Sequence, residues 1–128
     1  MKINKNTKFI GMLLIAIFLI LSISGCNNNK SEKFGKNITE KRVIEVKEIF
    51  SNPYQYLNQN FKLEGKIVRE CPSGCWFYLE DNTGTIFVDI NPSGLSIPQR
   101  VGKKVTVEGE LKRKDGRMIF VGKGVEIK

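Results

Sequence analysis

The chain of 128 residues contains no histidine, and this absence removes several kinds of chemistry. Histidine is the commonest general base near neutral pH, the commonest metal ligand and the usual axial ligand of haem. A serine triad that depends on histidine is therefore impossible. No glycine-rich phosphate loop precedes a helix, and Glu80 and Asp81 point to opposite faces beside a turn, which suits hairpin capping better than a shared proton. We expect a non-enzymatic protein without a metal or cofactor.

Long apolar runs are also scarce, and the longest extends from Phe9 to Ile23 behind three lysines. It has about 15 residues, whereas a membrane-spanning helix needs about 20, so a signal peptide is favoured over an uncleaved anchor. The segment resembles the bacterial lipoprotein signal, with Ile23 three positions before Cys26 and Ser24-Gly25 between them. This resemblance predicts a signal peptide at 1–25, a lipid on Cys26 and a location at the extracytoplasmic face of the cell membrane.

Residues 26–41 contain few large apolar side chains and are rich in Asn, Lys, Ser and Gly. Such a segment buries too little surface to offset its ordering entropy, so we predict a flexible tether. The formal net charge of +8 includes three lysines of the leader and falls to +5 for the remainder. This moderate charge favours contact with anionic polymers or lipid headgroups, and equally suits ordinary solubility.

The remaining residues, 42–128, form the predicted folded domain. Apolar residues at helical spacing between Val43 and Phe50 predict one helix that plugs the core and ends before Pro53. Alternating residues then predict five strands, at 61–70, 75–81, 85–91, 103–113 and 117–128. Two of the strands share a Glu-Gly pair, Glu64-Gly65 and Glu108-Gly109. Glycine within a strand often marks a bulge or sharp bend, as a small closed barrel requires.

The block from Phe61 to Lys128 resembles the OB-fold of the nucleic-acid-binding, tRNA-anticodon-like type, through its CWFYLEDNTGTIFVDI centre and its GKKVTVEGEL strand. With the leader, it is similar to small exported OB-fold proteins of uncharacterised function that carry a Gly-Cys-Trp motif. The resemblance implies an all-β, five-stranded Greek-key barrel with an N-terminal helix. The segment 91–102 departs from that pattern, because its prolines and glycines predict a loop where most OB-folds have a helix.

Three aromatic residues provide the candidate ligand site. If the aliphatic residues of the second and third strands fill the barrel, Trp76, Tyr78 and Phe87 share its outer face. Lys62 and Lys66 of the first strand would flank them, as stacking and phosphate attraction require. The alternative is that the helix or the loop at 91–102 covers these rings. The partners considered are single-stranded nucleic acid, another anionic polymer and an envelope protein.

Cys71 and Cys75 are separated by a Pro-Ser-Gly turn that lets the two thiols face each other. In an oxidising compartment a structural disulfide is the first expectation. A thiol–disulfide exchange pair and a soft-metal site remain alternatives, and metal would need carboxylate ligands such as Glu70, Glu80 or Asp81. We therefore expect a lipid-anchored binding or assembly module, with thiol or metal handling as the second interpretation.

Overall fold

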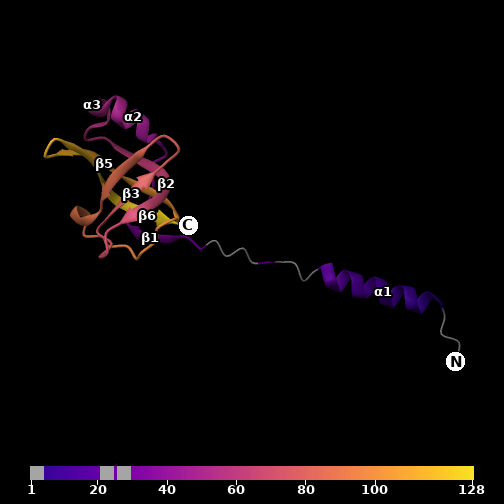
Figure 1. Cartoon of the computed structure of the whole chain (residues 1–128). Helices are drawn as coiled ribbons and strands as arrows, with labels where there is room; N and C mark the ends of the chain where they lie inside the picture. Colours follow the sequence, from indigo (N-terminus) through magenta and orange to yellow (C-terminus); the bar gives the residue numbers. More distant parts are fainter. Residues whose placement is uncertain (1–4, 21–24, 26–29) are drawn as a thin grey trace.

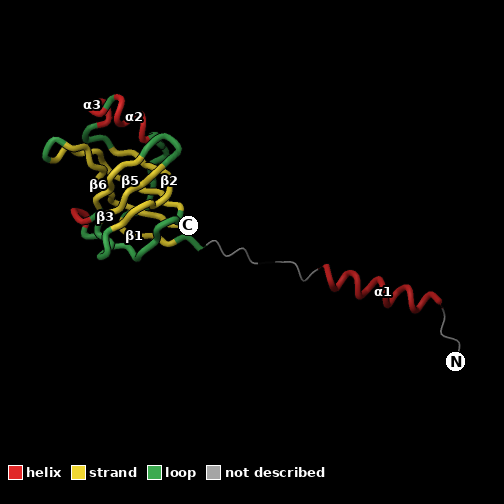
Figure 2. The backbone as a smooth tube through the Cα atoms, viewed as in Figure 1, coloured by secondary structure: helices red, strands yellow, loops and turns green. Residues whose placement is uncertain are grey.

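A computed structural model describes residues 5–20, 25 and 30–128 (Figures 1 and 2). An N-terminal helix, α1, covers Lys5–Ile20. Among the described residues, no helix has the length and apolar character that a membrane crossing requires. Cys26, the predicted lipidation site, lies outside the described residues. Among the described residues, every buried core side chain falls between Ile44 and Ile127, so a fragment of residues 27–128 contains all of these side chains and is expected to fold without α1.

The folded part contains six strands and three short helical segments. In chain order these are β1 (Glu32–Gly35), α2 (Val46–Ser51), α3 (Pro53–Tyr56), β2 (Asn60–Glu70), β3 (Trp76–Glu80), β4 (Thr85–Asp89), the 3-10 turn η2 (Asn91–Ser93), β5 (Lys104–Lys114) and β6 (Arg117–Ile127). The predicted loop at 91–102 is confirmed, apart from the turn η2. Ile97 of this loop is buried in the core.

The strands form a closed barrel. Their order is β1-β6-β4-β3-β2-β5, and a further pairing of β5 with β6 closes the ring. Neighbouring strands are antiparallel except for β4 and β6, which run parallel. This strand order, with β4 and β6 parallel, is that of the Greek-key barrel typical of OB-folds. The predicted all-β, OB-fold-like architecture is confirmed. The closed ring consists of the five predicted strands, β2 to β6, while β1, which was not expected, pairs only with β6.

The predicted flexible tether at 26–41 is wrong from Glu32 onward, and its residues 26–29 lie outside the described residues. Glu32–Gly35 pairs with the end of β6, in a register that places Glu32 opposite Ile127. The chain then crosses the barrel, where the buried carboxylate of Glu108 accepts hydrogen bonds from the backbone amides of Thr39 and Glu40 at 3.2 and 3.0 Å. The pairing with β6 and the hydrogen bonds to the Glu108 carboxylate offset the entropy lost on ordering this segment. The composition of the segment gives no sign of these interactions.

The helix that follows is shorter than its apolar pattern predicted. Val46 and Ile49 are fully buried, as expected for a helix that plugs the core. Val43, however, lies before α2 in a bridge to Lys62 and is 46% exposed, while Phe50 is 53% exposed. Backbone pairing with β2 holds residues 42–44 extended, so the helix begins only at Val46.

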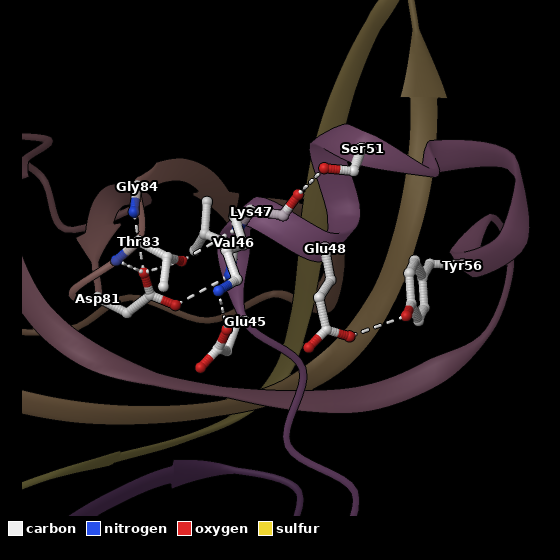
Figure 3. A network of polar contacts seen from close by, with 9 residues as sticks. All are labelled: Glu45, Val46, Lys47, Glu48, Ser51, Tyr56, Asp81, Thr83 and Gly84. Atoms are coloured by element: carbon white, nitrogen blue, oxygen red, sulfur yellow. Dashed lines mark hydrogen bonds and ion pairs between the residues drawn. The ribbon is translucent and has the colours of Figure 1, made fainter.

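A carboxylate on the neighbouring hairpin caps this helix (Figure 3). One oxygen of Asp81 accepts the amide of Val46 at 2.9 Å, while the other accepts the amides of Thr83 and Gly84 at 2.7 and 3.0 Å and the Thr83 hydroxyl at 2.6 Å. Burial alone would raise the pKa of Asp81, but these hydrogen bonds outweigh it and lower the pKa. Asp81 therefore joins the β3–β4 turn to α2. The expectation of hairpin capping is confirmed for Asp81.

Both Glu-Gly pairs lie where strands coil. A Cβ on Gly65 would lie 2.4 Å from the carbonyl oxygen of Glu80, where β2 passes from β5 to β3. A Cβ on Gly109 would lie 2.0 Å from the carbonyl oxygen of Val121, next to a register shift in the β5–β6 pairing. Only glycine permits these close approaches, as the repeated pair predicted.

Glu110 links the outer faces of β5 and β6. Its carboxylate pairs with Lys112 at 2.8 Å and also with Lys123. Hydrogen bonds from Lys112 and then from Lys123 lower the pKa of Glu110 to about 2. The side chain is 23% exposed, so solvent screens these pairs only in part.

Candidate ligand-binding face

Three aromatic side chains gather on the outer face of the β3–β4 hairpin. The register places Tyr78 directly opposite Phe87, and Trp76 is the next outward residue of β3. Ring centroids are 5.8 Å apart for Trp76 and Tyr78, 5.6 Å for Trp76 and Phe87, and 5.3 Å for Tyr78 and Phe87. All three side chains are half-buried, so part of each remains open to solvent. The structure thus brings together the aromatic residues that the sequence placed on one face.

The cation beside these rings is Arg69, which the sequence analysis missed. Its guanidinium carbon lies 5.9 Å from the ring centre of Trp76 and 6.0 Å from that of Tyr78. Strict alternation from Phe61 would turn Arg69 into the barrel, but a register shift between Ile67 and Arg69 places Arg69 opposite Tyr78. A β-bulge of this kind re-aims side chains and leaves little trace in the sequence.

Only one of the two predicted lysines flanks the aromatic residues. Lys66 lies opposite Glu80 on β3, beside the aromatic face but not on its rings. Lys62 lies opposite Glu108 in the β2–β5 register, and its amine is 3.7 Å from a carboxylate oxygen of Glu64. At about 3.3 Å per residue, seven positions separate Lys62 from Arg69 by about 23 Å along β2. The expectation that Lys62 flanks the aromatic residues is therefore corrected, because the strand is long and turns away from them.

A hollow of about 510 Å³ opens between Tyr78, Phe87 and the β5–β6 hairpin. The hairpin contributes two cations, Lys114 and Arg117, and one acid, Asp115. The apolar part of the wall comes from Met118 and Ile119. The aromatic face thus continues into a groove of net positive charge, and we refer to Arg69, Trp76, Tyr78, Phe87 and this hollow as the aromatic groove.

The two cysteines lie in the connection between β2 and β3, and Cys75 directly precedes Trp76. Both are free thiols, and their sulfur atoms are 2.8 Å apart. Cys71 Sγ is also 3.1 Å from the Ser73 hydroxyl. The hydrogen bond from Cys75, supported by Ser73, lowers the pKa of Cys71 to about 6, and the same contact raises the pKa of Cys75. The pair is therefore composed of one acidic, buried thiol and one more accessible thiol.

The β4–β5 loop holds this cysteine turn in place. The amide group of Gln99 donates to the carbonyl oxygen of Cys71 at 2.8 Å, and Ser96 donates to that of Ser73 at 2.7 Å. Gly74 has a φ of +75°, and a Cβ there would lie 1.9 Å from the carbonyl oxygen of Ile97. Within residues 5–20, 25 and 30–128, no three acidic or cysteine side chains cluster as metal ligands would.

Comparison with solved structures finds the hypothetical protein ygiW from E. coli. The match has 20% sequence identity, covers 73% of this chain and 100% of that chain, and has a TM-score of 0.54. No protein-family model matches the chain, and no curated protein matches it. At this level of identity the likeness concerns the fold alone. The closed strand order and this neighbour together define a small OB-fold-like protein.

Proposed function

We propose that the protein is a non-enzymatic binding module that holds a single-stranded oligonucleotide or a similar anionic chain in the aromatic groove. The observation that carries this proposal is Arg69, whose guanidinium lies over both Trp76 and Tyr78 beside a hollow that contains Lys114 and Arg117. Aromatic rings stack on bases, and cations beside them attract the phosphates. Sugars and proteins also bind OB-folds, so these ligands are the alternatives that the experiment must separate.

The proposed location is the extracytoplasmic face of the cell membrane, with a lipid on Cys26 as the anchor. The support is the sequence pattern of residues 1–26, a basic start, an apolar run and small residues before the cysteine. The same pattern supports export of the folded domain. An exported anionic polymer or an envelope protein would meet the groove in that compartment.

The test is binding of fluorescent single-stranded DNA and RNA to the 27–128 fragment, measured by polarisation over a range of salt. We expect affinity to fall as salt rises, because binding releases counterions. Trp76→Ala should weaken binding by about 1–3 kcal/mol, the usual contribution of one stacked base. Arg69→Ala should weaken binding and flatten the salt slope, whereas Lys62→Ala, which removes a lysine far from the rings, should leave both unchanged.

Equal losses for Arg69→Ala and Lys62→Ala would refute a localised groove and leave only general charge attraction. Binding of acidic polysaccharide without oligonucleotide binding would keep the groove and change its ligand. If neither polymer binds while both variants remain folded by circular dichroism, an envelope protein becomes the candidate partner.

A second candidate function is thiol–disulfide exchange, favoured by the 2.8 Å contact and the lowered pKa of Cys71. In this reaction the Cys71 thiolate attacks a disulfide of another protein, and Cys75 then loses its proton and displaces the reduced substrate. The products are a Cys71–Cys75 disulfide and two substrate thiols, a transfer of two electrons. A reduction potential between about −270 and −120 mV would support exchange, whereas a lower potential would indicate a structural disulfide.

A further inference from the structure

The chain joins the barrel at a fixed point. Glu32 begins β1 opposite Ile127 of β6. The Arg100 guanidinium from the β4–β5 loop binds both oxygens of the Glu32 carboxylate, at 2.7 and 2.8 Å. A two-point pair of this kind fixes geometry as well as adding attraction. Residues that precede Glu32 therefore leave the barrel from one defined edge.

This edge carries exposed lysines on both sides of β1. Lys30 and Lys103 line a hollow of about 450 Å³ on one side, and Lys33 and Lys36 line a second hollow on the other. The acids nearest to them are already engaged, since Glu32 pairs with Arg100 and Glu126 with Lys128. In the part of the chain that the structure describes, none of these four lysines makes an ion pair. We call Lys30, Lys33, Lys36 and Lys103 the lysine edge.

The chemistry of the lysine edge fits an extended anionic surface. Lysine amines are strongly hydrated point charges on flexible stems, suited to diffuse attraction more than to one fixed ligand. The aromatic residue of β1, Phe34, packs against the core, so it does not form a stacking surface with other rings of the kind seen in the aromatic groove. Anionic phospholipid headgroups provide a continuous layer of charge, to which each lysine near the surface adds attraction within about one Debye length, 8–10 Å.

The length of chain before this edge favours the same partner. Lys30 is four residues beyond Cys26, and even a fully extended chain spans at most about 3.6 Å per residue, which is about 14 Å. If Cys26 is lipidated as proposed above, the lysine edge cannot lie far from the headgroups. The folding of residues 32–41 onto the barrel creates this short reach, since a flexible segment through residue 41 would have allowed a far longer one.

From these observations we infer that the lysine edge docks the barrel onto anionic phospholipid. The test is sedimentation of the 27–128 fragment with vesicles of phosphatidylcholine alone or with about one third phosphatidylglycerol. This fragment has neither α1 nor a lipid, so the measurement does not depend on the proposed anchor. We expect binding only to the anionic vesicles, and weaker binding at high salt.

The variant K30Q/K33Q/K36Q/K103Q should lose at least tenfold in vesicle affinity, because each surface cation contributes up to about fivefold. The matched control K112Q/R113Q/K114Q/R117Q removes four cations from the β5–β6 hairpin and should retain most vesicle binding. Oligonucleotide binding should show the reverse order, so failure of one proposal is distinguishable from failure of the other. All three proteins are compared by thermal unfolding to verify that they fold.

Equal vesicle binding by the two variants would overturn the inference in favour of net charge. Binding to neutral vesicles as strong as to anionic ones would also overturn it. Competition by inorganic phosphate at millimolar concentration would indicate a small-anion site in place of a headgroup surface, and this too would contradict the proposed docking.

Discussion

Replacement of Asp81 by alanine should destabilise the fold strongly, although the residue lies in a surface turn. The substitution removes the acceptor of four hydrogen bonds, from the amides of Val46, Thr83 and Gly84 and from the Thr83 hydroxyl. Loss of a helix cap typically costs about 0.5–2 kcal/mol. Loss of a hydrogen bond to a charged group costs about 1.5–3 kcal/mol, and water replaces part of it at a half-buried site. We therefore expect a loss of about 2–3 kcal/mol.

The assay is urea and thermal unfolding of the 27–128 fragment followed by circular dichroism. A loss of this size lowers Tm by about 10–20 °C in a domain of about 100 residues. Asp81→Asn keeps one carbonyl oxygen, which satisfies either the turn or the helix, so it should lose about half as much. Glu80→Gln is the matched control, because Glu80 is exposed and its contact with Thr85 is 3.5 Å long.

The pH dependence provides a second check on Asp81. Its pKa is lowered in the folded protein, so its carboxylate stabilises the fold above the unfolded pKa of about 3.9. This contribution disappears as pH falls through the lower, folded pKa. The gap between wild type and Asp81→Asn should therefore be widest near neutral pH and shrink with acidification. A loss below about 0.5 kcal/mol for Asp81→Ala, or an equal loss for Glu80→Gln, would refute the reasoning.

Three further predictions follow from groups described above. Glu110→Gln should cost about 0.5–1 kcal/mol at pH 7, as partly exposed ion pairs do. The cost should decline as pH falls toward the folded carboxylate pKa of about 2, which its lysine neighbours depress. Urea unfolding over this pH range measures the change. Cys71 and Cys75 should form a disulfide in oxidised protein, visible as a loss of two mass units. The double serine variant should fold with a free energy of unfolding lower by at most about 2 kcal/mol. Alkylation of the reduced protein should increase as pH rises through about 6, the pKa of Cys71. In a lipoprotein-processing host, intact-mass measurement should find a mature chain that begins at a diacylated Cys26, and an unlipidated chain with residues 1–25 would contradict that assignment.

The sequence alone predicted the strands of the barrel because the features that mark them lie within short stretches of neighbouring residues. Alternating apolar residues locate β2 to β6, and the two Glu-Gly pairs mark where the strands coil. β1 was missed because EKFG has no strand pattern of its own and gains its order from pairing with β6 and from the ion pair between Glu32 and Arg100. The approach of segments far apart in the chain is not encoded in a window of neighbouring residues.

The candidate site was predicted in part for a similar reason. Alternation placed Trp76, Tyr78 and Phe87 on one face, since β3 and β4 are short and regular. Alternation did not identify Arg69, because a bulge in β2 turns this side chain from the barrel interior to the outer face. It also placed Lys62 beside the rings, whereas the length of β2 puts Lys62 far from them. A positive charge beside the aromatic residues was predicted correctly. The residue that lies over the rings is Arg69, and its position depends on one bulge in β2.

The pairing of Glu32 with Ile127 brings the two ends of the folded domain to one edge of the barrel. The flanking residues Lys30 and Lys128 line the same hollow. A short Gly-Ser linker from Lys128 to Lys30 can therefore close the chain into a ring without crossing the barrel. New ends can then be opened in the exposed turn at Asp115 and Gly116, where β5 passes into β6. Such a circular permutant keeps every strand pairing and moves any fused reporter to the opposite end of β6.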